Sequence, residues 1–337
     1  MIEVKNLTKN FGEKRAVNDL SFTVKEGVAY GFLGRNGAGK TTTIRILMNV
    51  FREDSGEALI DGVPAWKENK RIGYLPEERG LYGKRGVLEQ LIYYGLLKGL
   101  DRRAAEKEGK AKLKEMEAEE YTYKKLETLS KGNQQKIQLA VAMLGDPEVI
   151  ILDEPFSGLD PINAQVLKRA VRRQVDEGRT VIFSSHQMAQ VEEFCDDICI
   201  IDKGHAVLEG ELAAIKRSYP RDLLYVETEC TQGKPLPGLL ETMPFVMNIT
   251  PKGNGFTVKL SDPGKRSQLL RSLEEADARV DSFYVVEPSL EQIFVEKAGA
   301  LDPADEKDEP GEHGKGANTG NIHWRARLFG AGRRAAK

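Results

Sequence analysis

Residues 34–41 indicate the fold of this chain most strongly, and they read Gly34-Arg35-Asn36-Gly37-Ala38-Gly39-Lys40-Thr41. They fit the pattern G-x-x-x-x-G-K-[ST], the P-loop that binds phosphates between a strand and a helix. The flanking sequence agrees with that context. Residues 28–33 form a short apolar run typical of a buried strand, and residues 40–51 place apolar side chains on one helix face. The sequence therefore predicts a strand, loop and helix that bind a nucleoside triphosphate.

The residue types of this loop suit phosphate oxygens. Glycines let consecutive backbone N–H groups curve around a phosphate without Cβ clashes, and the N-terminus of the following helix adds partial positive charge. Lys40 is expected to reach the β- and γ-phosphates, and the Thr41 hydroxyl to bind Mg²⁺. The alternative is a glycine-rich surface turn before a lysine, and the strand and helix on either side argue against it.

The composition narrows the class of protein. The 337 residues suggest about two domains. A net charge of −2 provides no basic field for nucleic acid, and no run of about 18 apolar residues is present that could span a bilayer. The N-terminus lacks the apolar stretch of a secretory signal. Because Cys195, Cys199 and Cys230 form no C-x-x-C pair and are odd in number, reduced thiols in a cytosolic protein are expected.

Residues 1–217 are predicted to form one α/β domain. Strand and helix patterns alternate there, and residues 149–152 and 180–183 are continuous apolar or β-branched runs, as in a parallel sheet covered by helices. Residues 101–127 differ because they are rich in charge and carry few apolar residues. We expect them to form exposed helices of an inserted helical subdomain at about residues 78–135, with a merely solvated helical face as the alternative.

A second, small α/β domain is predicted over residues 220–299. Three segments in it have strand patterns and a fourth has leucines at helical spacing. Ser289 and Gln292 match a capping box at the start of a last helix. The segments with strand patterns are 223–228, 256–260 and 280–286, and the helical segment is 265–276.

Residues 300–337 are predicted to be a disordered tail. They are polar and rich in glycine, with too few apolar residues to form a core. Trp324, Leu328 and Phe329 lie among arginines there. That pattern suits contact with an anionic membrane surface, and a tail without function is the alternative.

Two adjacent carboxylates follow a buried strand in the segment Ile150-Ile151-Leu152-Asp153-Glu154-Pro155. Asp153 suits coordination of Mg²⁺, directly or through water, as the Walker B aspartate of P-loop enzymes does. Glu154, one residue further on, is expected to face the attacking water as a general base. A solvated turn is the alternative, and the P-loop upstream favours the catalytic interpretation.

The segment 129–135, which reads Leu-Ser-Lys-Gly-Asn-Gln-Gln, resembles the L-S-G-G-Q signature of ATP-binding cassette (ABC) ATPases. Further motifs of that family follow in order: Ser157-Gly158-Leu159-Asp160 resembles the D-loop and Ser184-Ser185-His186 the H-loop. Phe11 stands where the family has an aromatic that stacks on adenine, and Glu77 stands in the Q-loop in place of glutamine. The resemblance covers residues 1–217.

The resemblance implies a P-loop ABC nucleotide-binding domain in which ATP lies between the P-loop of one chain and the signature of a second, head-to-tail copy. It implies catalytic roles for Lys40, Glu154 and His186. The residues implied to hold Mg²⁺ are Thr41, Asp153 and Glu77. The residues implied to bind the nucleotide are Phe11, Gly34, Arg35, Asn36, Gly37, Ala38, Gly39, Lys40, Thr41, Thr42, Glu77, Ser130, Gly132, Asp153 and Asp160.

The departures from the family pattern resemble one subgroup. The sequence resembles ATP-binding subunits of exporters of the sodium-extrusion and antibiotic-resistance kind in two respects. It has Glu77, Lys131 and Asn133 at these motif positions, and it carries a C-terminal accessory domain. Such a subunit is cytoplasmic and lies on the inner face of the cell membrane through integral membrane permease subunits. The candidate contacts to such a partner, several of which can equally be core residues, are Leu81, Tyr82, Leu88, Leu91 and Tyr94.

Two other functions remain open at this point. A soluble ABC ATPase could act on ribosomes or nucleic acid, but this chain has a single P-loop and signature, no sustained heptads between them, and a near-neutral charge. A regulatory module without hydrolysis would be expected to lack Glu154 or His186, and both are present. No nucleic-acid partner is therefore expected.

Overall fold

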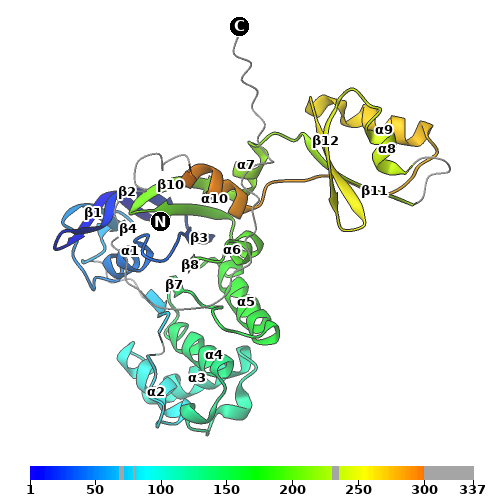
Figure 1. Cartoon of the computed structure of the whole chain (residues 1–337). Helices are drawn as coiled ribbons and strands as arrows, with labels where there is room; N and C mark the ends of the chain where they lie inside the picture. The colour runs from blue at the N-terminus through cyan, green and yellow to red at the C-terminus, as the bar shows by residue number, and fades with distance from the viewer. Residues whose placement is uncertain (68–71, 79, 230–234, 300–337) are drawn as a thin grey trace, which may run out of the picture. The chain divides into compact units, whose positions relative to one another are not determined.

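The computed structural model describes residues 1–67, 72–78, 80–229 and 235–299 (Figure 1). The predicted tail and Cys230 lie outside the described residues. Cys195 and Cys199 are buried free thiols, as expected. Within the described ranges, no helix has both the length and the apolar character needed to cross a membrane.

The central layer is a six-stranded sheet in the order β10-β9-β3-β8-β7-β6. The strands β9, β3, β8, β7 and β6 run parallel, and β10 pairs antiparallel with β9. The parallel strands β3, β7 and β8 are buried along their whole length, which explains their continuous apolar runs. The strand bounds are β3 Ala29–Leu33, β6 Ile72–Leu75, β7 Val149–Asp153, β8 Thr180–Ser185, β9 Asp197–Asp202 and β10 His205–Glu211.

The helices that accompany this sheet are α1, α5, α6 and α7. The first follows the P-loop and is shorter than the sequence pattern suggests. It ends at Leu47 and not at Phe51, because Asn49 adopts a left-handed backbone (φ 55°) and the N–H groups of Val50 and Phe51 turn back to the carbonyl of Arg45. The helix bounds are α1 Lys40–Leu47, α5 Pro161–Asp176, α6 Met188–Phe194 and α7 Leu212–Arg217.

A second, antiparallel sheet in the order β2-β1-β4-β5 packs in one apolar cluster with the P-loop helix. Its first strand ends at Phe11, and the ring of Phe11 meets that of Phe51 edge to face at 5.3 Å between centroids. This contact places Phe11 beside the P-loop helix. The strand bounds are β1 Ile2–Phe11, β2 Lys14–Val24, β4 Ser55–Ile60 and β5 Val63–Pro64.

The inserted helical segment contains α2, α3 and α4, with two short 3₁₀ turns before α4. The few apolar residues of the charged stretch 101–127 attach this segment to the core, since Leu113 and Met116 are fully buried there. Leu88 and Leu91 are also core residues, whereas Tyr82 is 57% exposed. The bounds are α2 Val87–Leu97, α3 Arg102–Glu115, η1 Glu119–Tyr121, η2 Leu126–Thr128 and α4 Lys131–Ala142.

The small domain has the element order βαββαβ and the strand order β12-β13-β11-β14, with all pairs antiparallel. This is the ferredoxin-like arrangement. The three predicted strands are present, and the fourth, β12, carries Asn248 and Pro251 in a mostly exposed segment without an alternating pattern. One face of the sheet packs with α8 and α9 in its own core. The bounds are β11 Leu223–Glu229, α8 Leu236–Leu240, β12 Val246–Lys252, β13 Gly255–Leu260, η3 Pro263–Lys265, α9 Arg266–Glu275 and β14 Arg279–Val285.

The last described helix, α10 (Leu290–Gly299), packs in the core of the six-stranded sheet and not in the core of the small domain. The predicted capping box is present, because Ser289 N donates to Gln292 Oε1 at 2.9 Å and Gln292 N to Ser289 Oγ at 3.2 Å. Phe294, 5% exposed, shares its cluster with residues of α6. The chain thus returns to its first domain after the small one.

Candidate functional site

The P-loop connects β3 to α1 in a tight curve. Gly37 and Gly39 have φ angles of 83° and 109°, which side-chain-bearing residues rarely adopt. A Cβ on Gly39 would also lie 2.5 Å from the carbonyl oxygen of Ala16 in β2. Both glycines are therefore required by the backbone, and the loop leaves its N–H groups at the N-terminus of α1.

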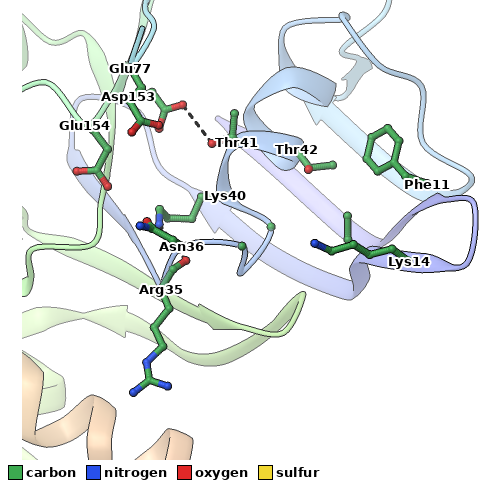
Figure 2. A pocket seen from close by; sticks show the side chains of 13 residues that line it. Phe11, Lys14, Arg35, Asn36, Lys40, Thr41, Thr42, Glu77, Asp153 and Glu154 are labelled. Carbon is green, nitrogen blue, oxygen red and sulfur yellow. Dashed lines mark hydrogen bonds between the residues drawn. The ribbon is translucent and has the colours of Figure 1, made fainter. Parts of the chain in front are cut away.

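Lys40 begins α1 and is only 7% exposed. Its ammonium donates to the carbonyl oxygens of Gly34 at 2.6 Å and Arg35 at 3.3 Å. The side chain therefore folds back onto the start of the P-loop (Figure 2). Burial lowers the pKa of Lys40, and the nearby carboxylates of Glu154, Asp153 and Glu77 act in the opposite direction. The result is a buried cation at the position where phosphate charge would arrive.

Asp153 ends β7 and is 1% exposed. Ser184 Oγ donates to Asp153 Oδ1 at 2.9 Å, and Thr41 Oγ1 to Oδ2 at 3.4 Å (Figure 2). Burial raises the pKa of Asp153, and the charge of Glu77 raises it further. A hydroxyl and carboxylates are hard oxygen donors, which suit Mg²⁺. Among the described residues, no cluster of three His, Cys, Asp or Glu side chains is arranged to hold a metal ion.

Glu154 stands one residue beyond the strand with a left-handed backbone (φ 49°) and is 6% exposed. Its Oε1 accepts from the backbone N–H of His186 at 2.8 Å and lies 2.7 Å from His186 Nδ1. Its Oε2 accepts from Ser185 Oγ at 3.1 Å. The end of β8 therefore holds the carboxylate at three points, and the glutamate and histidine that the motifs single out are in direct contact.

These groups surround a cavity of about 390 Å³, within the ~300–1,000 Å³ range of small-molecule sites. Figure 2 shows the side chain of Phe11 on the side of the cavity away from Glu77, Asp153 and Glu154. Two lining residues, Lys14 and Ala16, belong to no motif and were not predicted. The lining residues are Phe11, Lys14, Ala16, Arg35, Asn36, Gly37, Gly39, Lys40, Thr41, Thr42, Glu77, Asp153 and Glu154.

Six predicted residues do not line this cavity. Gly34 and Ala38 belong to the P-loop itself, and His186 contacts Glu154. The other three are Ser130, Gly132 and Asp160.

Ser130 is the N-cap of α4, and Asp160 is the N-cap of α5. Asn163 joins the two, because its Nδ2 donates to Asp160 Oδ2 at 2.6 Å and would lie 2.6 Å from a Cβ on Gly132. The signature and D-loop residues therefore lie next to each other. They do not line the cavity formed by the P-loop of the same chain.

Comparison with known proteins places the chain in a family. The model described as "ABC transporter" matches residues 17–157, and the model "ATP-binding protein DrrA1-3-like, C-terminal domain" matches residues 210–298. The chain is 39% identical over 302 residues, 89% of this chain and 99% of the relative, to the uncharacterized ABC transporter ATP-binding protein YhaQ of Bacillus subtilis. The chain belongs to the ABC transporter ATP-binding proteins. It is thus an ABC-type ATPase, and the fold expected from its sequence is confirmed.

Other ABC relatives include the Nod factor export ATP-binding protein I of Ralstonia nicotianae, which is 30% identical over 309 residues, 89% of this chain and 94% of that protein. The linearmycin resistance ATP-binding protein LnrL of Bacillus subtilis is 30% identical over 306 residues, 89% of this chain and 98% of that protein. The ABC transporter ATP-binding protein NatA of the same organism is 33% identical over 236 residues, 67% of this chain and 96% of its own length. The reading as a ribosome-acting or nucleic-acid-acting ATPase finds no support among these relatives.

Solved structures of ABC transporter subunits also match this chain. An ATP-binding subunit of an ABC transporter aligns with a TM-score of 0.60 at 29% identity, over 64% of this chain and 92% of that one. The dimeric structure of a bacterial ABC transporter cassette aligns with a TM-score of 0.58 at 25% identity, over 63% of this chain and 99% of that one.

Proposed function

We propose that this ABC ATPase binds ATP with Mg²⁺ in the cavity around Lys40 and uses Glu154 to activate the attacking water. One observation carries the proposal: a P-loop cation, a hydroxyl–carboxylate pair and a second carboxylate converge on one cavity. Lys40 would exchange its loop carbonyls for β- and γ-phosphate oxygens. Phe11, exposed at 45%, offers its ring to the adenine.

The metal and the water have separate carboxylates. Thr41, Asp153 and Glu77 would hold Mg²⁺, which neutralises charge on the β- and γ-phosphates. Glu154 would accept the proton of the attacking water. His186 fixes that carboxylate through its backbone N–H and Nδ1, so we assign its other ring nitrogen to the γ-phosphate.

The second half of the nucleotide site would come from a second copy of the chain. Gly132 and Asp160 lie beside Asn163, and Ser130 begins the helix that carries Gly132. None of the three lines the cavity, so they can close a partner's site. The N-terminus of α4 then faces the γ-phosphate held by the partner's P-loop. A related cassette crystallised as a dimer supports this arrangement.

The transport partner would be an integral membrane permease, which would place this subunit on the cytoplasmic face of the membrane. Exposed apolar side chains on α2 and the loop before it support this partner. Leu91 is core, but Tyr82, Tyr93 and Leu97 are exposed at 57%, 46% and 66%. By analogy with the relative named for Nod factor export, we propose that transport is outward.

Capture from membranes tests this proposal. Tagged Glu154→Gln chain, incubated with ATP and detergent-solubilised native membranes, should retain a multi-spanning membrane protein in stoichiometric amount. Lys40→Ala, which should not bind ATP, is the control and should retain less. Recovery of ribosomal or DNA-bound proteins with no membrane protein would overturn the permease partner.

A further inference from the structure

Helix α4 buries two glutamine side chains that belong to no motif function. Gln135 is 7% exposed and Gln138 is 4% exposed. Burying an amide group without a hydrogen bond destabilises the folded protein, so the partners of these two side chains indicate why glutamine stands here. Being three residues apart, the two side chains lie on one face of the helix.

Gln138 bonds to the backbone on both sides of Glu77. Its Nε2 donates to the carbonyl oxygen of Pro76 at 3.4 Å and to that of Glu78 at 3.1 Å. Glu77 itself lines the ATP cavity, close enough to Asp153 to raise the pKa of that carboxyl. One amide therefore bonds the carbonyl group directly before Glu77 and the carbonyl group of the residue after it, and so holds the backbone that carries the Glu77 side chain.

Gln135 does the same for the other carboxylate loop. Its Nε2 donates to the carbonyl oxygen of Pro155 at 3.3 Å, one residue beyond Glu154. A single helix thus binds the segment of the metal-facing carboxylate and the segment of the water-facing carboxylate. That helix begins at Ser130, where its N-cap side chain accepts from Asn133 N at 3.4 Å.

We propose that Gln138 is a positioning residue for ATP hydrolysis, which holds Glu77 in place for Mg²⁺ and ties it to the signature helix α4. The proposal rests on the proposed function, because it assumes that Glu77 meets the metal and that Ser130 meets the partner's ATP. Seating of the partner's γ-phosphate on the N-terminus of α4 then fixes Glu77 in the chain's own site through Gln138.

Loss of the Gln138 amide should affect the binding of Mg²⁺ and not the binding of ATP itself. Loss of the amide frees the peptide groups beside Glu77, whereas the P-loop, Lys40 and Thr41 keep their own contacts. Residues that orient metal ligands typically contribute about 10–100-fold to metal affinity or activity. ATP binding without Mg²⁺ should hardly change.

The test measures ATPase activity of the purified full-length chain against Mg²⁺ concentration at saturating ATP. Gln138→Met keeps the length of the side chain without its donors, and Gln138→Asn keeps an amide that is too short to reach both carbonyls. Gln174→Met on α5 is the matched control, since Gln174 is 1% exposed, equally buried, and does not line the cavity. Glu77→Ala, alone and with Gln138→Met, tests whether the effect passes through Glu77.

Gln138→Met is expected to raise the half-saturating Mg²⁺ concentration and to lower kcat by about 10-fold. ATP affinity without Mg²⁺ should change by less than about 2-fold, and Gln138→Met should have no further effect in Glu77→Ala. If Gln138→Met does not fold, Gln138→Asn must show the same rise in Mg²⁺ requirement.

A wild-type Mg²⁺ dependence, a change equal to that of Gln174→Met, or a full effect in Glu77→Ala would each overturn the inference. The failure of the proposed function is distinguishable from these results. In that case the wild-type chain and Lys40→Ala would hydrolyse ATP at the same rate, whatever stands at position 138.

Discussion

The guanidinium of Arg35, inside the P-loop, lies over the ring of Phe294 in α10, with 5.8 Å from Cζ to the ring centroid. In Figure 2 the Arg35 side chain points away from Lys40. The same helix packs on α6, which follows His186, and Leu290 N donates to Glu192 Oε2 at 3.1 Å. The helix that follows the small domain thus contacts both the phosphate loop and the element behind the H-loop.

A double-mutant cycle should detect this contact. Phe294→Ala should lower the free energy of unfolding by about 3–5 kcal/mol, because it empties a site in the core. Arg35→Ala should cost only about 0.5–1 kcal/mol, since the guanidinium is exposed. The urea midpoints of both single variants and the double variant measure the coupling, which we expect at about 0.5–1 kcal/mol. Strict additivity would contradict a direct contact.

Nucleotide binding should take up protons at alkaline pH. Burial lowers the pKa of Lys40 below its usual value, and phosphate oxygens raise that pKa again on binding. ATP affinity should therefore fall as the pH rises through the lowered pKa. Calorimetry in buffers of different ionisation enthalpy measures the uptake. Lys40→Arg, which does not titrate, should show none; equal uptake there would assign the proton elsewhere.

Glu77→Gln should leave ATP hydrolysis largely intact, and it should shift the pH at which the ATPase rate falls on acidification. The charge of Glu77 adds to burial in raising the pKa of Asp153, so its removal should lower that pKa. Because ionised Asp153 is required for the metal, the fall in activity on acidification should then begin at lower pH. The ATPase rate of both proteins, followed downward from neutral pH at saturating Mg²⁺, measures this. Complete loss of activity would show that Glu77 performs chemistry beyond holding the metal.

Lys98 should stabilise the helical subdomain. Its ammonium donates to the carbonyl oxygens of Val141, Ala142 and Leu144 at 3.1, 2.8 and 2.8 Å, at the end of α4. Lys98→Met leaves these acceptors without that donor and should cost about 1–3 kcal/mol. Thermal unfolding of the wild type and of Lys98→Met measures this loss. The control is Arg85→Met, which removes an exposed cation from the same subdomain.

The pH dependence of that difference has a definite sign. Burial lowers the pKa of Lys98 from 10.5 to about 8. The unfolded chain therefore binds more protons between these values, and the stability of the wild type relative to Lys98→Met should rise over that range. A fall over the same range would show that the ammonium is favoured in the folded state.

The parts of the site that could be predicted from the sequence are those encoded locally. The P-loop lies between a strand and a helix within about 25 residues, a pattern that specifies its own fold. Asp153 and Glu154 follow an apolar run that can only be a buried strand in that context. Their positions at the cavity follow from a parallel sheet, whose carboxyl ends share one edge.

The parts that could not be predicted depend on which surfaces meet. The apolar face of α10 is visible in the sequence, but its spacing does not say that it packs against α6 and not against the small domain. Gln135 and Gln138 resemble surface residues of a helix, yet both are buried and bond to two loops that are distant in sequence. Phe51 has helical spacing with Leu47, yet the left-handed Asn49 turns it toward Phe11.

The most direct test of the account is the mass of purified Glu154→Gln chain by light scattering with ATP and Mg²⁺. Glu154 is proposed to activate the water, and Ser130 and Gly132 to close a partner's site, so this variant should hold unhydrolysed ATP between two copies. We predict twice the mass of one chain with ATP, and the mass of one chain with ADP or with Lys40→Ala added to the same background. A chain that binds ATP and stays monomeric would contradict the shared nucleotide site.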